Sequence, residues 1–361
     1  MARITLENLA HSYLAKPVDE ADYALRKMDH IWEDGGAYAL LGPSGCGKTT
    51  LLNIISGLLT PSEGRVLFDG EDVTPLEPQG RNIAQVFQFP VIYDTMTVAD
   101  NLAFPLRNRG MDEAAVQKRV AEIGDLLELT PDLKKRARGL TADAKQKISL
   151  GRGLVRSDVA AILFDEPLTV IDPQVKFQLR RKLRQIHEEF ALTLVYVTHD
   201  QTEALTLADK VAVMYEGQVV QLGTPQELFE NPAHTFVGYF IGSPGMNLLD
   251  CQLQGGVAQI GGMSLPLAHD TVRAARDAIG DLKLGIRPEF LELKSAPEDG
   301  ALPAKIATVE DLGNYKIVRA NLGKETVAIK LPEDQSVPSE QAYLAFPPRW
   351  TKIYADDRLV A

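Results

Sequence analysis

A glycine-rich segment near the start of the chain has the residues and the spacing to hold phosphate groups. The stretch GPSGCGKT, residues 42–49, fits the pattern G-x-x-x-x-G-K-[ST], with the strand-like YALL before it and the helix-like TTLLNIISGLL after it. Glycines let consecutive backbone N–H groups surround phosphate oxygens, and the positive end of the following helix points at them. We therefore expect Lys48 to reach the β- and γ-phosphates of a nucleotide and the Thr49 hydroxyl to coordinate Mg²⁺. The predicted phosphate-site residues are Gly42, Pro43, Ser44, Gly45, Cys46, Gly47, Lys48, Thr49 and Thr50.

Two apolar runs further along the chain end in side chains that could complete a reaction at this phosphate. AAILFDEP delivers Asp165 and Glu166 at the end of a strand-like run, and LTLVYVTHD ends a second run at His199. In such a site the first acid holds the Mg²⁺ shell and the second polarises an attacking water. A lone histidine after a strand could be a solvated loop residue, but these neighbours make His199 a candidate for contacting the γ-phosphate. His187, within PQVKFQLRRKLRQIHEEF, has no such neighbours and is predicted to lie on the surface.

The elements that must position these residues follow from the order of the apolar segments. Short apolar runs alternate with helical patterns in the first part of the chain, which predicts an α/β sheet with parallel members. Between about residues 88 and 155 the strand signals stop, and DEAAVQKRVAEIGDLLEL places apolar residues at helical spacing, as expected of a helical insert. After SPGMN, near residue 245, short strands and turns predict a second, β-rich domain.

Composition sets the class of protein that these motifs belong to. With 361 residues, 45% of them hydrophobic, the chain can form two domains. The net charge of −11 argues against a large basic face for nucleic acid, and the two distant cysteines, Cys46 and Cys251, argue against a disulfide framework. The sequence has neither a signal-peptide pattern nor an apolar run of about 18 residues that could span a bilayer. Work at a membrane would therefore require a partner that holds the chain there.

In this order the motifs resemble the nucleotide-binding subunit of an ATP-binding cassette (ABC) transporter, and the resemblance covers nearly the whole chain. It implies ATP and Mg²⁺ as cofactors and an α/β P-loop NTPase fold with a helical subdomain at about residues 88–155. The tail, with GIRPEF and VEDLGNYKIV, resembles the OB-like (TOBE-type) accessory domain of sugar and polyol importer ATPases. The predicted domains are accordingly 1–242, an ABC ATPase domain, and 247–361, a β-rich OB-like domain.

The resemblance also assigns roles to single residues. Tyr13 matches the aromatic residue that stacks on adenine, and Gln88 matches the glutamine that reaches Mg²⁺ and the attacking water. His199 matches the switch histidine. Asp172 ends the loop PLTVID, which in the family crosses to the partner ATPase; here Thr169 and Val170 replace the usual serine and alanine or asparagine. The surface near FPVIYDTM would receive a coupling helix of the permease.

The family signature L-S-G-G-Q is altered in this chain. GLTADAKQKISLGRGLV, aligned by its downstream Gln146 and its Gly-Arg pair, places on those five positions Leu140, Thr141, Ala142, Asp143 and Ala144. Thr141 keeps a hydroxyl and can cap the helix start. In a head-to-tail dimer, Asp143 would face the partner's ATP, where two like charges about 4 Å apart repel by roughly 4 kcal/mol at an effective dielectric of 20. The alternative is that Asp143 only stabilises its own helix and points elsewhere.

These observations predict an ATP-hydrolysing subunit of a bacterial importer, at the cytoplasmic face of the inner membrane. Two transmembrane permease subunits would hold it there, and a periplasmic substrate-binding protein would serve it indirectly. We expect it to pair with a second, non-identical ATPase whose signature is intact, and to bind no nucleic acid. VFQFPVIYDTMTV and FVGYFIGSPGMN resemble ATPases of bacterial glycerol uptake systems, which favours glycerol as cargo. Two alternatives stay open: a soluble ABC-type ATPase acting on ribosomes or DNA, and a regulatory subunit that binds ATP with little hydrolysis.

Overall fold

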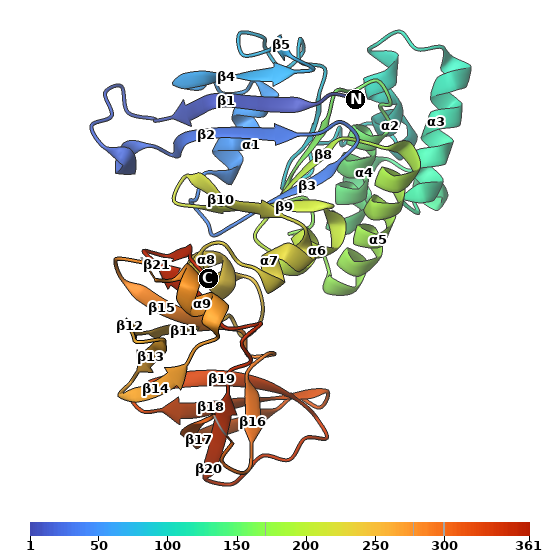
Figure 1. The fold of residues 1–361 in the computed structure, drawn as a ribbon. Helices are drawn as coiled ribbons and strands as arrows, with labels where there is room; N and C mark the ends of the chain where they lie inside the picture. The colour runs from blue at the N-terminus through green and yellow to red at the C-terminus, as the bar shows by residue number, and fades with distance from the viewer. Residues whose placement is uncertain (170, 277, 299) are drawn as a thin grey trace. The chain divides into compact units, whose positions relative to one another are not determined.

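The computed structural model describes residues 1–169, 171–276, 278–298 and 300–361. The chain divides into two units, Met1–Pro225 and Gln226–Ala361 (Figure 1). The hydrophobic residues of the first unit form two buried clusters and those of the second unit form another. The predicted limits of the two domains, 1–242 and 247–361, stay a prediction.

A six-stranded sheet forms the centre of the first unit. Its strands, in spatial order, are β10 (Gln218–Gly223), β9 (Lys210–Tyr215), β3 (Ala37–Leu41), β8 (Leu194–Thr198), β7 (Ile162–Asp165) and β6 (Ala84–Val86). All neighbouring pairs are parallel except β9 and β10, which pair antiparallel. Strands β3 and β8 are buried along their whole length, as expected of apolar runs covered on both faces. The prediction of an α/β sheet with parallel members is confirmed.

A second sheet, which the sequence did not predict, lies beside the first. It is antiparallel and consists of β2 (Leu25–Trp32), β1 (Ile4–His11), β4 (Glu63–Phe68) and β5 (Glu71–Asp72). Helix α1 (Lys48–Ser56) shares a buried cluster with residues of both sheets. Strand β2 escaped the apolar-run criterion because charged and polar residues separate its buried positions.

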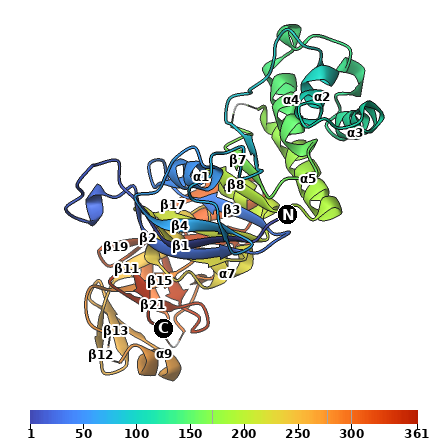
Figure 2. The same cartoon turned by 90° about the horizontal axis from the view of Figure 1, so that it is seen from above.

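The predicted helical insert lies between β6 and β7. It contains α2 (Val98–Arg107), α3 (Glu113–Leu126), α4 (Ala142–Leu154) and the short 3₁₀ helices η2 (Thr130–Asp132) and η3 (Ala137–Gly139). Figure 2 shows α2, α3 and α4 gathered on one side of the first unit, away from β1, β2 and β4. Apolar side chains on these helices pack together, among them Leu102, Val120 and Ile148.

Helix α5 (Pro173–Phe190) corrects one prediction. Its apolar stripe packs into the core through Leu179, Leu183 and Ile186. His187, predicted on the surface, is buried, because the chain turns at Ala191, just after the helix, and brings Leu192 against the ring. Its Nδ1 lies 2.9 Å from the Leu192 carbonyl oxygen, and its Nε2 lies 3.3 Å from an Asp209 carboxylate oxygen. Helix α6 (Gln201–Leu207) then follows β8.

The second unit is rich in strands, as predicted. Its helices are α7 (Pro225–Glu230, which begins at the boundary), α8 (Thr235–Phe240) and α9 (His269–Ala274). Its strands are β11 (Asn247–Asp250), β12 (Gln252–Gln254), β13 (Val257–Ile260), β14 (Met263–Pro266), β15 (Leu282–Ile286), β16 (Glu292–Lys294), β17 (Leu302–Asp311), β18 (Tyr315–Leu322), β19 (Glu325–Pro332), β20 (Gln341–Ala345), β21 (Lys352–Ala355) and β22 (Arg358–Leu359). They form three sheets, of which the largest has the order β16-β20-β17-β18-β19.

A buried arginine stabilises the helices of this unit. The guanidinium of Arg287, just after β15, donates to the carbonyl oxygens of Leu228, Phe229, Gly238 and Ile241, and it lies 4.1 Å from the centre of the Phe229 ring. Burial lowers the pKa of Arg287 to about 10. The four carbonyls belong to α7, α8 and the residue that ends α8, so one side chain satisfies groups that helix ends otherwise leave without partners.

Candidate active site

The loop between β3 and α1 has the backbone of a phosphate-binding turn. Gly45 and Gly47 adopt φ angles of +82° and +100°, which L side chains rarely adopt. A Cβ atom at Gly47 would also lie 2.6 Å from the Ala24 carbonyl oxygen, so only glycine fits there. Helix α1 begins at Lys48, directly after this glycine, so its first N–H groups are at the loop. The local sequence thus forms the glycine turn and helix start at which the motif predicts anion binding.

Lys48 is fixed inside this loop. Its side chain is buried, and its Nζ donates to the carbonyl oxygens of Gly42 at 2.8 Å and Pro43 at 2.9 Å. An ammonium group removed from water requires such acceptors. Cys46 lies beside it, with Sγ 3.9 Å from Nζ, and burial raises the pKa of the Cys46 thiol. The cation is therefore held at the loop by backbone oxygens.

Thr49 and Asp165 meet at the end of β7. The Thr49 hydroxyl is 3.4 Å from a carboxylate oxygen of Asp165. Burial and the neighbouring Glu166 charge raise the pKa of Asp165, while the Thr49 hydroxyl and Lys48 oppose this shift. A hydroxyl and a carboxylate oxygen are suitable ligands for Mg²⁺. The described part of the chain contains no cluster of three or more His, Cys, Asp or Glu that could hold a metal.

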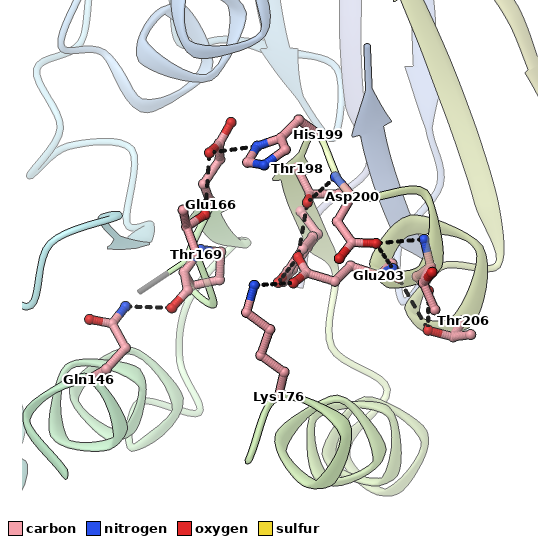
Figure 3. Close-up of polar contacts among 12 residues, drawn as sticks. Gln146, Glu166, Thr169, Lys176, Thr198, His199, Asp200, Glu203 and Thr206 are labelled. Carbon is pink, nitrogen blue, oxygen red and sulfur yellow. Dashed lines mark hydrogen bonds and ion pairs between the residues drawn. The ribbon is translucent and has the colours of Figure 1, made fainter. Parts of the chain in front are cut away.

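Glu166 and His199 lie side by side at the same edge of the sheet (Figure 3). Strands β7 and β8 are parallel neighbours with Asp165 opposite Val197, so the residues after each strand come together. His199 Nδ1 is 3.0 Å from a Glu166 carboxylate oxygen, and the Thr169 hydroxyl donates to the same oxygen at 3.3 Å. Glu166 has a φ of +46°, a left-handed conformation that is strained for a side chain of this type. The carboxylate is 21% exposed and the imidazole 52%, so both are open to solvent.

The other predicted contacts are placed as follows. Gln88 comes two residues after β6, the neighbour of β7, and is half-buried. Tyr13 is 67% exposed, its hydroxyl lies 3.1 Å from that of Thr50 in α1, and its ring contacts His11 edge-on. The aromatic ring is thus beside the first turn of the helix that begins at Lys48. The roles of these residues toward a nucleotide stay predictions.

Comparison with known proteins agrees with this arrangement. The family model described as "ABC transporter" matches residues 25–169, and the one described as "MalK OB fold domain" matches residues 242–291. The chain is 39% identical over 340 residues to the sn-glycerol-3-phosphate import ATP-binding protein UgpC of Paraburkholderia xenovorans, covering 92% of this chain and 91% of that protein. The chain belongs to the ATP-binding subunits of ABC transporters.

Two further relatives extend the comparison for this ABC ATPase. The protein of the same name from Salmonella typhimurium is 41% identical, and the match covers 84% of this chain and 84% of that protein. The one from Jannaschia sp. is 35% identical, and the match covers 99% of each chain. A solved structure, cbiO1 from Clostridium perfringens, described as part of the ABC transporter complex cbiONQ, superposes with a TM-score of 0.57 at 27% identity over 63% of this chain and 90% of that one. The chain is an ATPase subunit of an importer, with an ABC ATPase domain followed by an OB-fold domain.

Gln146 joins three parts of this ABC ATPase, which sequence reasoning did not predict. Its buried side chain, on α4, donates through Nε2 to the Pro167 carbonyl oxygen at 2.7 Å and to the Phe87 carbonyl oxygen at 3.4 Å. Pro167 follows Glu166, and Phe87 precedes Gln88. The helix that carries the altered signature is thus bonded to the segments that carry Glu166 and Gln88 (Gln146 and Glu166 are labelled in Figure 3).

The altered signature forms the start of α4. The Thr141 hydroxyl caps the helix by accepting from the Ala144 N–H at 3.3 Å, as the sequence predicts. Thr141 and Ala142 are exposed, while Leu140, Asp143 and Ala144 are half-buried. One Asp143 oxygen lies 4.0 Å from Lys147 Nζ, one turn further along the helix, and the other has no hydrogen-bond partner within the described residues. The acid therefore has a cation on its own helix, while its position relative to a partner's ATP stays a prediction.

Asp172 caps the N-terminus of α5 by accepting from the Gln174 N–H at 2.9 Å, which gives the end of the crossing loop a fixed position. Val170, which was also assigned to that loop, lies outside the described residues. Among the residues that the structure describes, no helix is both long and apolar enough to cross a bilayer.

Proposed function

We propose that this chain binds MgATP at its own phosphate loop and hydrolyses it with Glu166 and His199. The observation that carries the proposal is that Lys48, Thr49 and Asp165 gather at the edge of the sheet where Glu166 and His199 meet. Bound Mg²⁺ would neutralise phosphate charge. Thr49 and Asp165 would hold it, with Gln88 reaching toward the same ion.

The remaining groups would act on the water and the γ-phosphate. The Glu166 carboxylate can accept a proton from an attacking water, because its Oε2 oxygen faces the hydrogen-bond donors of His199 and Thr169 and not an acid. His199 can turn its other ring nitrogen toward the γ-phosphate while Nδ1 remains beside Glu166. Phosphate-loop amides and Lys48 would stabilise the charge that develops on the phosphate oxygens. Tyr13 would cover the adenine.

The experiment is ATP turnover by the assembled importer with His199→Ala, with His269→Ala as matched control. His269 is an exposed histidine of the second unit, outside the proposed site. We expect His199→Ala to lower kcat by about 100-fold, with the KM for ATP changed by less than about threefold. The control should match the unmodified chain. Undiminished turnover in His199→Ala would contradict the proposal, and no turnover in the unmodified complex would favour the regulatory alternative.

We further propose that the chain works at the cytoplasmic face of the bacterial inner membrane, held by two permease subunits. The segment FPVIYDTM supports this, because Phe89, Val91 and Tyr93 expose 69%, 54% and 40% of their surface next to Gln88. Apolar side chains grouped in this way suit a protein partner. A periplasmic binding protein would deliver the cargo, and no nucleic acid takes part.

For the cargo we propose a small polyol or its phosphate ester. Motif resemblance favours glycerol, and the names of the relatives carry sn-glycerol-3-phosphate. The ATPase does not contact the cargo in either case, so only a transport measurement can distinguish the two compounds. Uptake of labelled glycerol and of labelled sn-glycerol-3-phosphate, each competed with the other, would distinguish the two; uptake of neither would contradict this part.

The pairing with a non-identical ATPase stays part of the proposal. The names of the relatives give it no support, so it depends on residues 140–144 alone, where both glycines of the signature are replaced. The purified chain, without another ATPase, should then show at least about tenfold lower turnover than the complete complex. Turnover of the lone chain equal to that of the complex would contradict unlike pairing and would leave the ATPase proposal intact.

A further inference from the structure

A buried carboxylate lies directly behind the His199 turn. Glu203, on α6, is 2% exposed, and its Oε2 atom accepts two hydrogen bonds from β8: one from the Tyr196 hydroxyl at 3.0 Å and one from the Thr198 hydroxyl at 2.9 Å. Burial, and then the Glu203 charge, raise the pKa of Tyr196, so the phenol stays protonated and donates. A buried carboxylate is costly to retain, and nothing in the proposed reaction uses it directly.

Thr198 transmits this contact to the backbone around His199. Its buried hydroxyl donates to Glu203 and at the same time accepts from the Asp200 N–H at 3.0 Å. The donor direction of a hydroxyl is set by its acceptor, so Glu203 fixes which way the Thr198 oxygen presents its lone pairs. The residues on both sides of His199 are thereby linked to one carboxylate, Thr198 directly and Asp200 through the Thr198 hydroxyl.

Asp200 completes the attachment on the other side of the turn. Its carboxylate caps α6 by accepting from the Thr202 N–H at 2.8 Å and the Glu203 N–H at 3.2 Å. His199 therefore lies between two anchored residues, and its imidazole, half exposed, extends from a backbone that has little freedom. Figure 3 shows this sequence of bonds from Glu203 through Thr198 to Asp200, with His199 reaching Glu166 on the other side.

The second oxygen of Glu203 faces another helix. Lys176 Nζ, in the first turns of α5, lies 3.7 Å from Glu203 Oε1, which has no hydrogen-bond partner within the described residues. Lys176 comes four residues after Asp172, the cap of α5 at the end of the proposed crossing loop. The carboxylate behind His199 is thus paired with a cation from the helix that starts at that loop.

We propose that Glu203 is a positioning residue for His199, acting through the Thr198 hydroxyl, and that its pairing with Lys176 links the His199 turn to the start of α5. This rests on the proposed role of His199 in ATP hydrolysis. Glu203 is buried behind the turn and acts through Thr198; it keeps the imidazole in the place from which Nδ1 meets Glu166. A misplacement of about 1 Å can cost on the order of 100-fold in rate, so such support has a measurable effect.

The test compares two variants of the assembled importer, each of which loses one buried hydroxyl: one at the end of β8 and one just before its start. Thr198→Val deletes the hydroxyl that links the Glu203 carboxylate to the Asp200 N–H. The matched control is Thr193→Val: Thr193 precedes β8, is equally buried, and its hydroxyl accepts from the Gly35 N–H and donates to Asp34. We expect Thr198→Val to lower kcat about 10- to 100-fold at nearly constant KM for ATP. Thr193→Val and the conservative Thr198→Ser should keep kcat within about threefold.

A double substitution separates positioning from general weakening of the fold. In a His199→Ala chain, Thr198→Val should cause no further loss of the residual single-turnover rate, because its effect passes through the missing imidazole. Equal losses in both backgrounds, or undiminished kcat in Thr198→Val, would overturn the inference. If His199→Ala itself keeps full turnover, the proposed function fails instead, so the two failures are distinguishable.

Glu203→Gln gives a second measure if Thr198→Val does not assemble. It keeps an oxygen to accept from Tyr196 and Thr198 but loses the charge that faces Lys176. A loss of kcat at nearly constant KM, reproduced by Lys176→Met, supports the proposal. Undiminished kcat in an assembled Glu203→Gln importer would overturn the link to α5.

Discussion

At the scale of single residues, the site depends on side chains that follow the ends of neighbouring parallel strands. Asp165 ends β7, Glu166 comes directly after it, and His199 follows β8, so one sheet edge collects the proposed metal-binding acid, base and switch. The arrangement concentrates negative charge: burial and the adjacent Glu166 raise the pKa of Asp165. The chain retains a carboxylate where the folded state disfavours its ionisation, as functional sites commonly do.

Asp165→Asn should therefore stabilise the chain in the absence of nucleotide and metal. The folded state, with the raised pKa, holds its proton more tightly than the unfolded state, so ionisation costs stability as pH rises above the usual range of an aspartate. Asparagine removes this cost. We expect an unfolding temperature roughly 2–4 °C higher at pH 7, with the difference shrinking toward pH 4, measured by calorimetry. A lower unfolding temperature at pH 7 would contradict this account.

The same substitution should weaken Mg²⁺ binding at the proposed site. The asparagine side chain offers a neutral oxygen in place of a carboxylate, so half-maximal ATP hydrolysis should need about 10-fold more Mg²⁺. The measurement is a Mg²⁺ titration of turnover at saturating ATP, with Asp334→Asn, in the second unit, as control. An unchanged Mg²⁺ requirement would remove Asp165 from the proposed metal shell.

Sequence reasoning singled out the residues that meet at this edge, but not the side chains that support them. Local motifs contain the phosphate loop, Asp165, Glu166 and His199, so the neighbouring residues along the chain are enough to identify them. Gln146 bonds to the backbone carbonyls of Phe87 and Pro167, which are distant in sequence. Glu203 bonds to Thr198, which belongs to another element. No local sequence pattern indicates such partners. His187 was misplaced for the same reason, because its partners Leu192 and Asp209 come later in the chain.

At the scale of elements, α4 is the helix that connects the altered signature with the edge of the central sheet. Its first turn carries Thr141 and Asp143 of the signature, and its second carries Gln146, which is bonded to the segments after β6 and β7. The helical insert was predictable from its 3.6-residue spacing. The antiparallel sheet of β1, β2, β4 and β5 was not, because charged residues interrupt β2 and β5 has two residues.

Gln146→Leu should loosen this junction. The substitution is close in volume but leaves two carbonyl oxygens without their donor, at a cost of about 1–3 kcal/mol in the free energy of unfolding. Urea denaturation of the purified chain measures it. Gln117→Leu, at an exposed position of α3, is the matched control and should change the same quantity by less than about 0.5 kcal/mol. Equal effects of the two changes would show that the bonds from Gln146 contribute little.

In the second unit, Arg287 has the corresponding role for α7 and α8. Arg287→Lys keeps the charge but not the planar group that reaches four carbonyl oxygens. We expect amide hydrogen exchange in residues 226–241 to accelerate by about 10-fold or more. Arg319→Lys, at an exposed position of β18, should leave those amides unchanged. Unchanged protection in Arg287→Lys would mean that the helices are stabilised by packing alone.

At the scale of the whole molecule, the chain combines an unaltered phosphate site with an altered signature. Lys48, Thr49, Asp165, Glu166 and His199 are in place for a reaction in this chain, whereas residues 140–144 lack both glycines that would approach a partner's nucleotide. If the altered signature limits turnover, restoring it should help the lone chain.

The variant Ala142→Gly with Asp143→Gly tests this directly. It removes two Cβ atoms and one acidic charge at the start of α4 while keeping the Thr141 cap. We expect turnover of the lone chain to rise by about 10-fold, despite a helix weakened by roughly 1 kcal/mol for each glycine. Asp125→Gly, at an exposed position of α3, controls for the added flexibility. Unchanged turnover would mean that Asp143 only serves its own helix, beside Lys147.

The most direct test of the central claim is the chemical state of the nucleotide bound to Glu166→Gln. The assembled importer, incubated with MgATP and separated from free nucleotide, should retain intact ATP in Glu166→Gln, whereas the unmodified complex and Glu189→Gln, an exposed acid of α5, should hold ADP. The account would be contradicted if Glu166→Gln bound ATP and converted it to ADP as fast as the unmodified chain, because hydrolysis would then not depend on Glu166 at this sheet edge.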